Sequence, residues 1–249
     1  MNRLDELGMQ VLGESPSLQN HEAARMAALS SALAPIFRGK FCDTLLPTRA
    51  TRGFDAEEVI YDLGDTERTF FFIRQGVVKI GTTTNTGRAI IYDLRKGGEV
   101  VGELCAVEPI RRDRAVAVER TDAIPVPFAE VLDTLAKHPA LLHDIVGIFC
   151  GALAEAYDQV NRLAADDVMH RVVDVLKALA RKLGRPLGEL VEIVAYLTQE
   201  EIAEMAVVRR ERVSTALNDL RRQGIAQYSR GGRLLLDMRA LEGFRPSAG

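Results

Sequence analysis

Residues 198–224 constrain the fold of this chain more than any other segment, because they predict two short helices joined by a tight turn. Thr198 can cap the first helix, and Glu201 three residues later completes a capping box. Apolar residues at three- and four-residue spacing give the second helix a face to bury; they are Val213, Ala216, Leu217 and Leu220. Gly224 is suited to end that helix. The pattern is typical of a helix-turn-helix, whose second helix enters the DNA major groove.

The charge of the second helix and of the segment after it favours binding to DNA. Residues 209–233 contain seven arginines and two acids, a local charge of about +5 in a chain whose formal net charge is −3. A basic segment in an acidic chain marks a local attraction for phosphates. The candidates for DNA contact in the two helices are Thr198, Arg209, Arg210, Glu211, Arg212, Ser214 and Thr215.

Two short apolar runs follow this second helix and surround residues 229–233. Gly231 and Gly232 between them predict a hairpin turn. A hairpin directly after a recognition helix is a wing, and its tip would bring Arg230 and Arg233 to DNA phosphates. With an amphipathic helix over 167–183 and a loop over 184–188, residues 167–249 are therefore predicted to form a winged helix-turn-helix domain.

Residues 48–127 have a different character, with short β-rich runs separated by turn signals. The predicted strands are Glu58–Tyr61, Thr69–Arg74, Val77–Thr82 and Arg88–Leu94. Many short strands at close spacing favour an antiparallel sandwich or roll. We therefore predict an α+β fold with a β-roll over 36–138. Residues 1–35 are expected to be an irregular extension with a helix near residues 21–34.

A long helix is predicted from Pro139 to about residue 166, and its apolar residues repeat every seven positions. The repeating residues are Leu142, Val146, Phe149, Leu153, Ala156, Val160 and Leu163. Alternating steps of four and three are typical of a coiled-coil seam. Two interpretations remain open: a parallel homodimer, which would give two recognition helices for two half-sites, and a stripe packed within one chain.

A β-roll can also hold a metal-dependent enzyme, which would need His and carboxylate ligands inside the roll. None of the four histidines lies between residues 48 and 127; they are His21, His138, His143 and His170. No Ser or Cys nucleophile has a recognisable His partner. We therefore expect neither catalysis nor a bound metal.

The three cysteines are widely spaced and have apolar neighbours; they are Cys42, Cys105 and Cys150. This spacing disfavours an iron–sulfur cluster and predicts buried free thiols in a reducing cytoplasm. The chain also lacks a run of about eighteen apolar residues, so we expect a cytoplasmic protein without a membrane span.

Three segments together resemble the catabolite activator/FNR (CRP/FNR) family of bacterial transcription regulators. Gly97–Leu104 resembles the family's phosphate-binding cassette, and Asp167-Val168 with Arg171 resembles its hinge. Gln199–Leu217 resembles the family's helix-turn-helix, with Arg210-Glu211 at the base-reading pair. The resemblance implies a homodimer on palindromic double-stranded DNA, and contact with RNA polymerase if the protein activates transcription.

The effector pocket that the resemblance implies departs from that of the family's cyclic-AMP sensors. Glu103, which in such sensors binds the ribose hydroxyl, is kept. Asp113-Arg114 occupies the place of the Arg-Ser pair that grips the cyclic phosphate, and Asp113 would repel an anion. The pocket candidates are Gly102, Glu103, Leu104, Arg112, Arg114 and Tyr157. We predict no usual response to cyclic AMP; a different cyclic nucleotide remains the alternative to having no cofactor.

The DNA-reading segment departs from the family as well. Thr215 replaces a usual second arginine, Val207 replaces a usual turn glycine and Arg209 replaces a usual capping residue. These changes predict an altered half-site and, because Val disfavours positive φ, a turn of different shape. The alternative is a scaffold protein with the same fold that no longer binds DNA.

Overall fold

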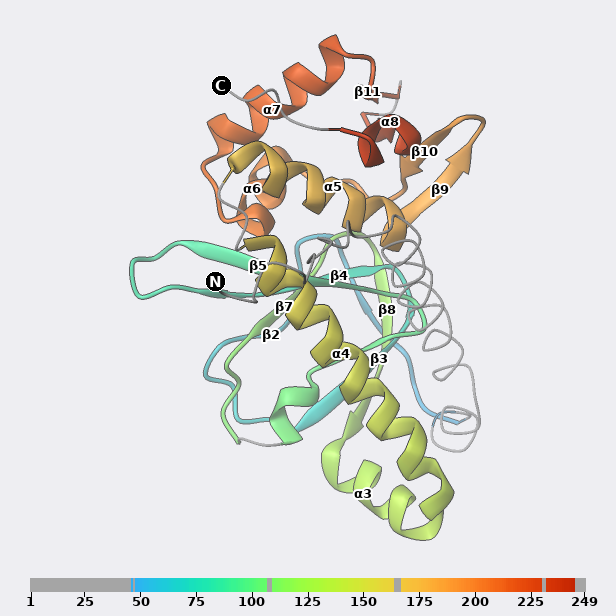
Figure 1. The fold of residues 1–249 in the computed structure, drawn as a ribbon. Coiled ribbons are helices and arrows are strands. Elements are labelled where there is room, and N and C mark those ends of the chain that lie inside the picture. The colour runs from blue at the N-terminus through green and yellow to red at the C-terminus, as the bar shows by residue number, and fades with distance from the viewer. Residues whose placement is uncertain (1–45, 47, 107–108, 164–166, 230–231, 245–249) are drawn as a thin grey trace, which may run out of the picture.

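The computed structural model describes residues 46, 48–106, 109–163, 167–229 and 232–244. The predicted extension over 1–35, its helix and Cys42 lie outside these residues. Within them the chain forms a β-roll, a long helix and a carboxy-terminal domain of helices with a small sheet (Figure 1).

The β-roll consists of two antiparallel four-stranded sheets. One sheet has the order β1 (Arg52–Phe54), β8 (Thr121–Pro127), β3 (Thr69–Gln75) and β6 (Val100–Val101). The other has the order β2 (Val59–Tyr61), β7 (Arg114–Ala117), β4 (Val77–Thr83) and β5 (Ala89–Lys96). Side chains from both sheets, among them Phe54, Phe71 and Val78, pack into one core. The predicted roll and its four predicted strands are thus confirmed, while β1, β6, β7 and β8 were missed.

Two helical segments follow the roll. Helix α3 (Phe128–Lys137) comes directly after β8, and the 3-10 turn η3 (Pro139–Leu141) leads into α4 (Leu142–Leu163). Pro139 therefore begins a 3-10 turn and not the long helix itself. Proline is well placed there because the first positions of a helix leave backbone N–H groups without partners.

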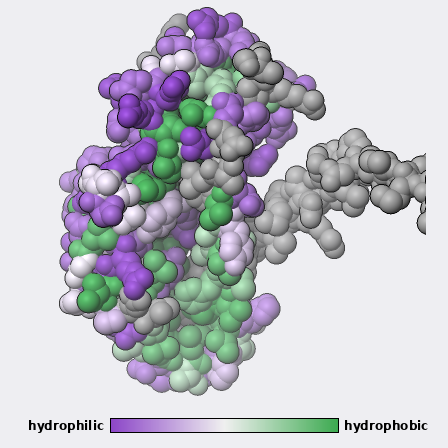
Figure 2. Space-filling view, turned by 60° about the vertical axis from the view of Figure 1, so that its left-hand side comes forward, coloured by the Kyte–Doolittle hydropathy of each residue, from purple (hydrophilic) through white to green (hydrophobic). Residues whose placement is uncertain are grey.

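Six heptad residues of α4 are exposed, so the interpretation as a stripe packed within one chain is wrong. Leu142 is 54% exposed, Leu153 51% and Val160 64%, and Val146, Phe149 and Ala156 are exposed as well. Figure 2 shows apolar residues gathered over the lower half of the visible face, the half that holds α3 and most of α4 in Figure 1. Cys150 on the same helix is exposed, contrary to the predicted buried thiol, whereas Cys105 is buried.

Residues 139–158 are long and apolar enough to cross a membrane by length and composition, the one such helix among the described residues. The side chain of Glu155 within this range forms an ion pair with Lys182 of the next helix. Apolar residues at heptad spacing beside such polar contacts favour packing against protein.

The carboxy-terminal domain combines four helices with an antiparallel sheet of the order β11-β12-β10-β9. Its elements are α5 (Val168–Leu183), β9 (Gly184–Leu187), β10 (Leu190–Ile193), α6 (Gln199–Ala206), α7 (Arg210–Arg222), β11 (Ala226–Tyr228), β12 (Leu234–Leu236) and α8 (Met238–Glu242). The predicted loop over 184–188 is wrong, because its residues form β9 and the start of a hairpin. Pro186 made this segment look like a loop in the sequence, because proline is unusual inside a strand. The proline is tolerated here because β9 lies at the edge of the sheet.

One apolar core joins the roll to the carboxy-terminal domain. Val77, Ile91 and Leu94 of the roll belong to the same buried cluster as Leu176 of α5 and Ile202 of α6. This shared core fixes how the two parts lie relative to each other in one protomer.

Candidate DNA-binding surface and effector pocket

The first helix of the helix-turn-helix, α6, begins with the predicted capping box. The Thr198 hydroxyl accepts a hydrogen bond from the Glu201 N–H at 3.2 Å, and the Glu201 carboxylate accepts one from the Thr198 N–H at 2.8 Å. These contacts satisfy backbone donors that the helix leaves without internal partners. The start of α6 is thereby fixed by local sequence alone.

The turn between α6 and α7 keeps a left-handed residue although the usual glycine is missing. Val207 has φ of +52° and ψ of +45°, and the next residue, Val208, is buried and donates its N–H to the Ala203 carbonyl at 3.0 Å. The predicted change in turn shape is therefore wrong. Packing of Val208 and the backbone hydrogen bond hold Val207 in a region that a β-branched residue disfavours.

Replacing Val207 with Gly is expected to raise the free energy of unfolding by about 0.5–1 kcal/mol. Glycine removes the cost of a left-handed side chain, while its greater freedom in the unfolded chain offsets part of that gain. Urea unfolding measures the difference. Val208→Gly is the matched control and should destabilise the protein, because Val208 is buried and has no positive φ. If Val207→Gly instead destabilises the protein, the claim that Val207 is strained in the folded state is contradicted.

The recognition helix α7 buries one face and exposes the other. Val213, Ala216, Leu217 and Leu220 are buried, as predicted. The side chains of Arg209, Arg210, Glu211, Arg212 and Thr215 are exposed, and Ser214 is half-buried. The Thr215 hydroxyl donates to the Glu211 carbonyl at 2.9 Å, so part of its hydrogen-bonding capacity is used within the helix. Figure 1 places α7 at the end of the molecule away from α3.

The wing follows α7 as predicted. Strands β11 and β12 pair antiparallel, and the Ser229 N–H donates to the Arg233 carbonyl at 2.8 Å across the turn. The side chain of Arg233 is 43% exposed and lies 3.8 Å from the carboxylate of Glu192 on β10. Arg230 lies outside the described residues.

A buried arginine of the roll forms hydrogen bonds that hold the cassette, the loop that resembles a nucleotide-binding site, in place. The buried Arg111 guanidinium donates to the Gly102 carbonyl at 2.6 Å and to the Thr69 carbonyl at 2.5 Å, and it lies 4.1 Å from the ring centre of Tyr61. Gly102 has φ of +88°, and a Cβ there would lie 2.9 Å from the Thr69 carbonyl oxygen. Arg111 therefore supports the loop and is not free for an anion.

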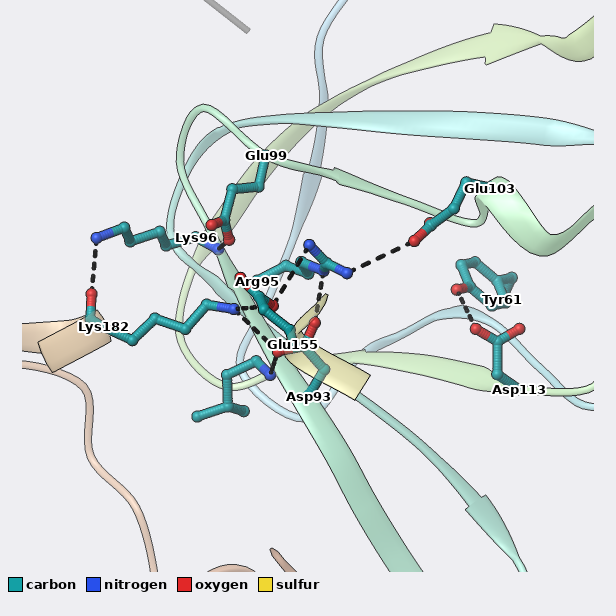
Figure 3. Close-up of polar contacts among 10 residues, drawn as sticks. Tyr61, Asp93, Arg95, Lys96, Glu99, Glu103, Asp113, Glu155 and Lys182 are labelled. Atoms are coloured by element: carbon teal, nitrogen blue, oxygen red, sulfur yellow. Dashed lines mark hydrogen bonds and ion pairs between the residues drawn. The ribbon is translucent and has the colours of Figure 1, made fainter. Parts of the chain in front are cut away.

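Two buried carboxylates lie beside this loop (Figure 3). Glu103 faces the Arg95 guanidinium at 3.6 Å, and Asp113 accepts a hydrogen bond from the Tyr61 hydroxyl at 3.0 Å. Burial raises the pKa of both carboxyl groups above their ordinary values. Acids at these positions make the local surroundings unfavourable for a phosphate.

The remaining pocket candidates are more exposed than this pair. Arg114 on β7 forms an ion pair with Asp62 at 3.4 Å, and its side chain is 39% exposed. Leu104 and Arg112 are exposed, and Tyr157 is exposed on α4. Among the described residues no group of three or more His, Cys, Asp or Glu side chains is arranged to hold a metal ion.

An ion-pair network that the sequence did not reveal links the cassette to the carboxy-terminal domain (Figure 3). Arg95 of β5 contacts Asp93 at 2.7 Å, and Lys182 of α5 contacts both Asp93 at 2.9 Å and Glu155 of α4 at 3.0 Å. Burial alone would raise the pKa of Asp93, but Lys182 and Arg95 hold it below its ordinary value. With the Glu103–Arg95 pair, the network forms a continuous polar path from the cassette to α5.

A Glu103→Gln variant is expected to be more stable than the parent at pH 7, because burial raises the pKa of the Glu103 carboxyl. A carboxyl whose folded pKa is raised favours folding below its unfolded pKa and loses that contribution as pH rises through the folded pKa. The gain should therefore vanish near pH 4 in a series of urea unfolding curves. Asp93→Asn is the matched control with the opposite sign, since the pKa of Asp93 is lowered. A less stable Gln variant at pH 7 would show that the Arg95 contact outweighs burial.

Both halves of the chain resemble known proteins. Residues 51–138 match the family described as the cyclic nucleotide-binding domain, and residues 170–244 match the Crp-like helix-turn-helix domain. The global nitrogen regulator of Synechocystis sp. is 29% identical over 192 residues, covering 76% of this chain and 84% of that regulator. The CRP-like cAMP-activated global transcriptional regulator of Mycobacterium tuberculosis is 24% identical over 216 residues, covering 86% and 89%. The structure of FixK2 from Bradyrhizobium japonicum shares the fold, with a TM-score of 0.70 at 21% identity, covering 81% of this chain and 100% of that one.

Proposed function

Because this chain belongs to the CRP/FNR family of bacterial transcription regulators, we propose that it binds a palindromic DNA site as a homodimer and without the usual response to cyclic AMP. Regulation of transcription through the helix-turn-helix follows from the family. The dimer, the effector and the individual DNA contacts are our proposal, and so is the cytoplasmic location that a chromosome-binding protein requires.

The exposed stripe on α4 supports the homodimer. Six apolar residues at heptad positions are exposed in one protomer, and three of them are more than half exposed. An exposed apolar stripe of this length on a soluble regulator marks an interaction surface. A second copy supplies an identical stripe, so parallel pairing covers both and places two recognition helices for two half-sites.

The observation that carries the loss of the cyclic AMP response is the burial of Asp113 beside Glu103. In the cyclic-AMP sensors that the pocket resembles, a guanidinium and a hydroxyl bind the cyclic phosphate. Here Asp113 occupies that position and accepts a hydrogen bond from Tyr61. The guanidinium of the nearby Arg111 donates its hydrogen bonds to two backbone carbonyls. A phosphate placed there would meet a buried carboxyl group, and the guanidinium of the nearby Arg111 is already engaged.

Calorimetric titration of the full-length protein with cyclic AMP and with cyclic GMP tests this proposal. We expect no binding of cyclic AMP in the micromolar range, and DNA affinity that is the same with and without it. Micromolar binding of cyclic AMP coupled to tighter DNA binding would overturn the proposal. Binding of cyclic GMP alone would support the alternative, a regulator gated by another cyclic nucleotide through residues such as Arg112.

A further inference from the structure

The ribbon formed by β4 and β5 lies against helix α6, and its basic side chains contact opposite ends of that helix. The Lys79 ammonium group donates to the Glu201 carboxylate at 2.8 Å, in the first turn of α6. The Arg88 guanidinium donates to the Val208 carbonyl at 2.7 Å, just beyond the last turn. One element of the roll therefore holds both ends of the first helix of the helix-turn-helix.

The dimensions of the two elements account for this match. Helix α6 has eight residues and is therefore about 12 Å long. Lys79 lies in β4, and Arg88 lies opposite Thr84, whose N–H donates to the Arg88 carbonyl at 2.8 Å, so the two basic residues are five strand positions apart. Five strand positions span about 17 Å. Their long side chains can therefore reach both ends of the shorter helix from the ribbon.

Both contacts satisfy groups that would otherwise be costly to bury. The side chains of Lys79 and Glu201 are only 16% and 10% exposed. Without Lys79, the Glu201 carboxylate would keep its hydrogen bonds from Thr198 but lose its cation, whereas Lys79 also contacts Glu57 at 2.9 Å. Carbonyl groups after the last turn of a helix have no internal partner, and Arg88 supplies one to Val208.

The orientation of α7 depends on these contacts because the two helices are joined rigidly. Val208 lies in the turn, is buried, and is followed directly by Arg209 at the start of α7. Ile202 of α6 and Leu217 of α7 belong to one buried cluster. A shift of α6 on the ribbon would therefore move the recognition helix with it.

We propose that Lys79 and Arg88 are positioning residues for DNA recognition, through which the roll sets the orientation of the recognition helix. The proposal rests on DNA binding by α7. Neither side chain needs to touch DNA, and the ribbon connects the helix-turn-helix to the roll without passing through the long helix. Lys79 and Arg88 act on the two ends of α6, so their joint loss should release it more than the loss of Arg88 alone.

The test compares the full-length double variant Lys79→Met/Arg88→Met with Arg88→Met, Arg88→Lys and the parent. Fluorescence anisotropy at several salt concentrations gives the affinity for the protein's selected DNA site and the slope against salt. We expect the double variant to bind about ten-fold more weakly with an unchanged slope, and Arg88→Lys to recover most of the loss of Arg88→Met. Arg120→Met is the matched control, since Arg120 is an exposed roll arginine that forms ion pairs with Asp55 and Asp122 of the roll; it should bind like the parent.

Unchanged affinity in the double variant would overturn the proposal. A slope reduced by about one per removed charge would also overturn it, because that would assign the residues to direct phosphate contacts. If the double variant fails to fold, Arg88→Met alone decides, since Arg88 is exposed. If the parent binds no DNA, the proposed function fails. Amide hydrogen exchange can still test whether Lys79 and Arg88 hold the two ends of α6. Exchange in α6 should be faster in the double variant than in Arg120→Met; equal exchange would contradict the positioning role of Lys79 and Arg88.

Discussion

A Leu153→Asp variant is expected to be monomeric where the parent protein is a dimer, and to bind its DNA site about 100-fold more weakly. Leu153 is 51% exposed and lies in the middle of the heptad stripe on α4. Pairing of two protomers would bury an aspartate in the apolar seam, next to its copy, with no cation to compensate. A monomer keeps one recognition helix and loses the gain in affinity from binding two linked half-sites.

Leu132→Asp is the matched control for this experiment. Leu132 is 50% exposed, but it lies on α3, outside the heptad stripe. Sedimentation velocity should find this variant dimeric and anisotropy should find its DNA affinity unchanged. A dimeric Leu153→Asp variant, or a Leu132→Asp variant that is equally monomeric, would contradict the assignment of the dimer surface to α4.

An Arg210→Ala variant is expected to lose its preference for one G·C pair in each half-site. Arg210 is exposed at the first position of α7, where a guanidinium can donate two hydrogen bonds to guanine O6 and N7. Such a contact contributes about 1–3 kcal/mol of discrimination, or roughly 5- to 150-fold between the correct and a wrong base. Competition binding against sites substituted at each position measures that discrimination directly.

Arg233→Ala provides the comparison, because it removes one wing charge without removing a base contact. It should weaken binding to all sequences alike and lower the salt slope by about one. The two substitutions are thus expected to have different effects: Arg210→Ala changes the base preference, whereas Arg233→Ala changes only the overall affinity. Uniform weakening by Arg210→Ala, with the base preference intact, would refute its role in reading sequence.

Sequence reasoning worked where local physics decides the structure. The capping box at Thr198 and Glu201 and the buried spacing on α7 depend on residues three and four positions apart, so the sequence contains the whole interaction. The heptad repeat of α4 could likewise be recognised from the spacing of its apolar residues. The wing was predictable because two glycines stand between two apolar runs.

Sequence reasoning failed where distant contacts override local preference. Val207 adopts a left-handed conformation because Val208 is buried and hydrogen-bonded, which no propensity scale includes. The strand at Pro186 exists because its edge position needs no hydrogen bond from proline. Cys150 is exposed because its helix lies on the surface of one protomer, a fact that apolar neighbours in the sequence conceal.

The polar residues that join the cassette to the carboxy-terminal domain were also invisible in the sequence. Asp93, Glu155 and Lys182 come from a strand and two helices that are far apart along the chain. Such charged residues usually lie on a solvated surface, so no spacing distinguishes them. The same holds for Lys79 and Arg88, whose contacts with α6 appear only once the ribbon is packed against it.

Selection of DNA sites from a random pool by the purified protein, with no cyclic nucleotide present, tests the central claim most directly. We expect enrichment of a two-fold symmetric sequence with a G·C pair in each half-site and with half-site centres one helical turn apart. A pool that stays random without cyclic AMP but yields a palindrome when it is added would contradict the claim that this regulator reads DNA without that effector.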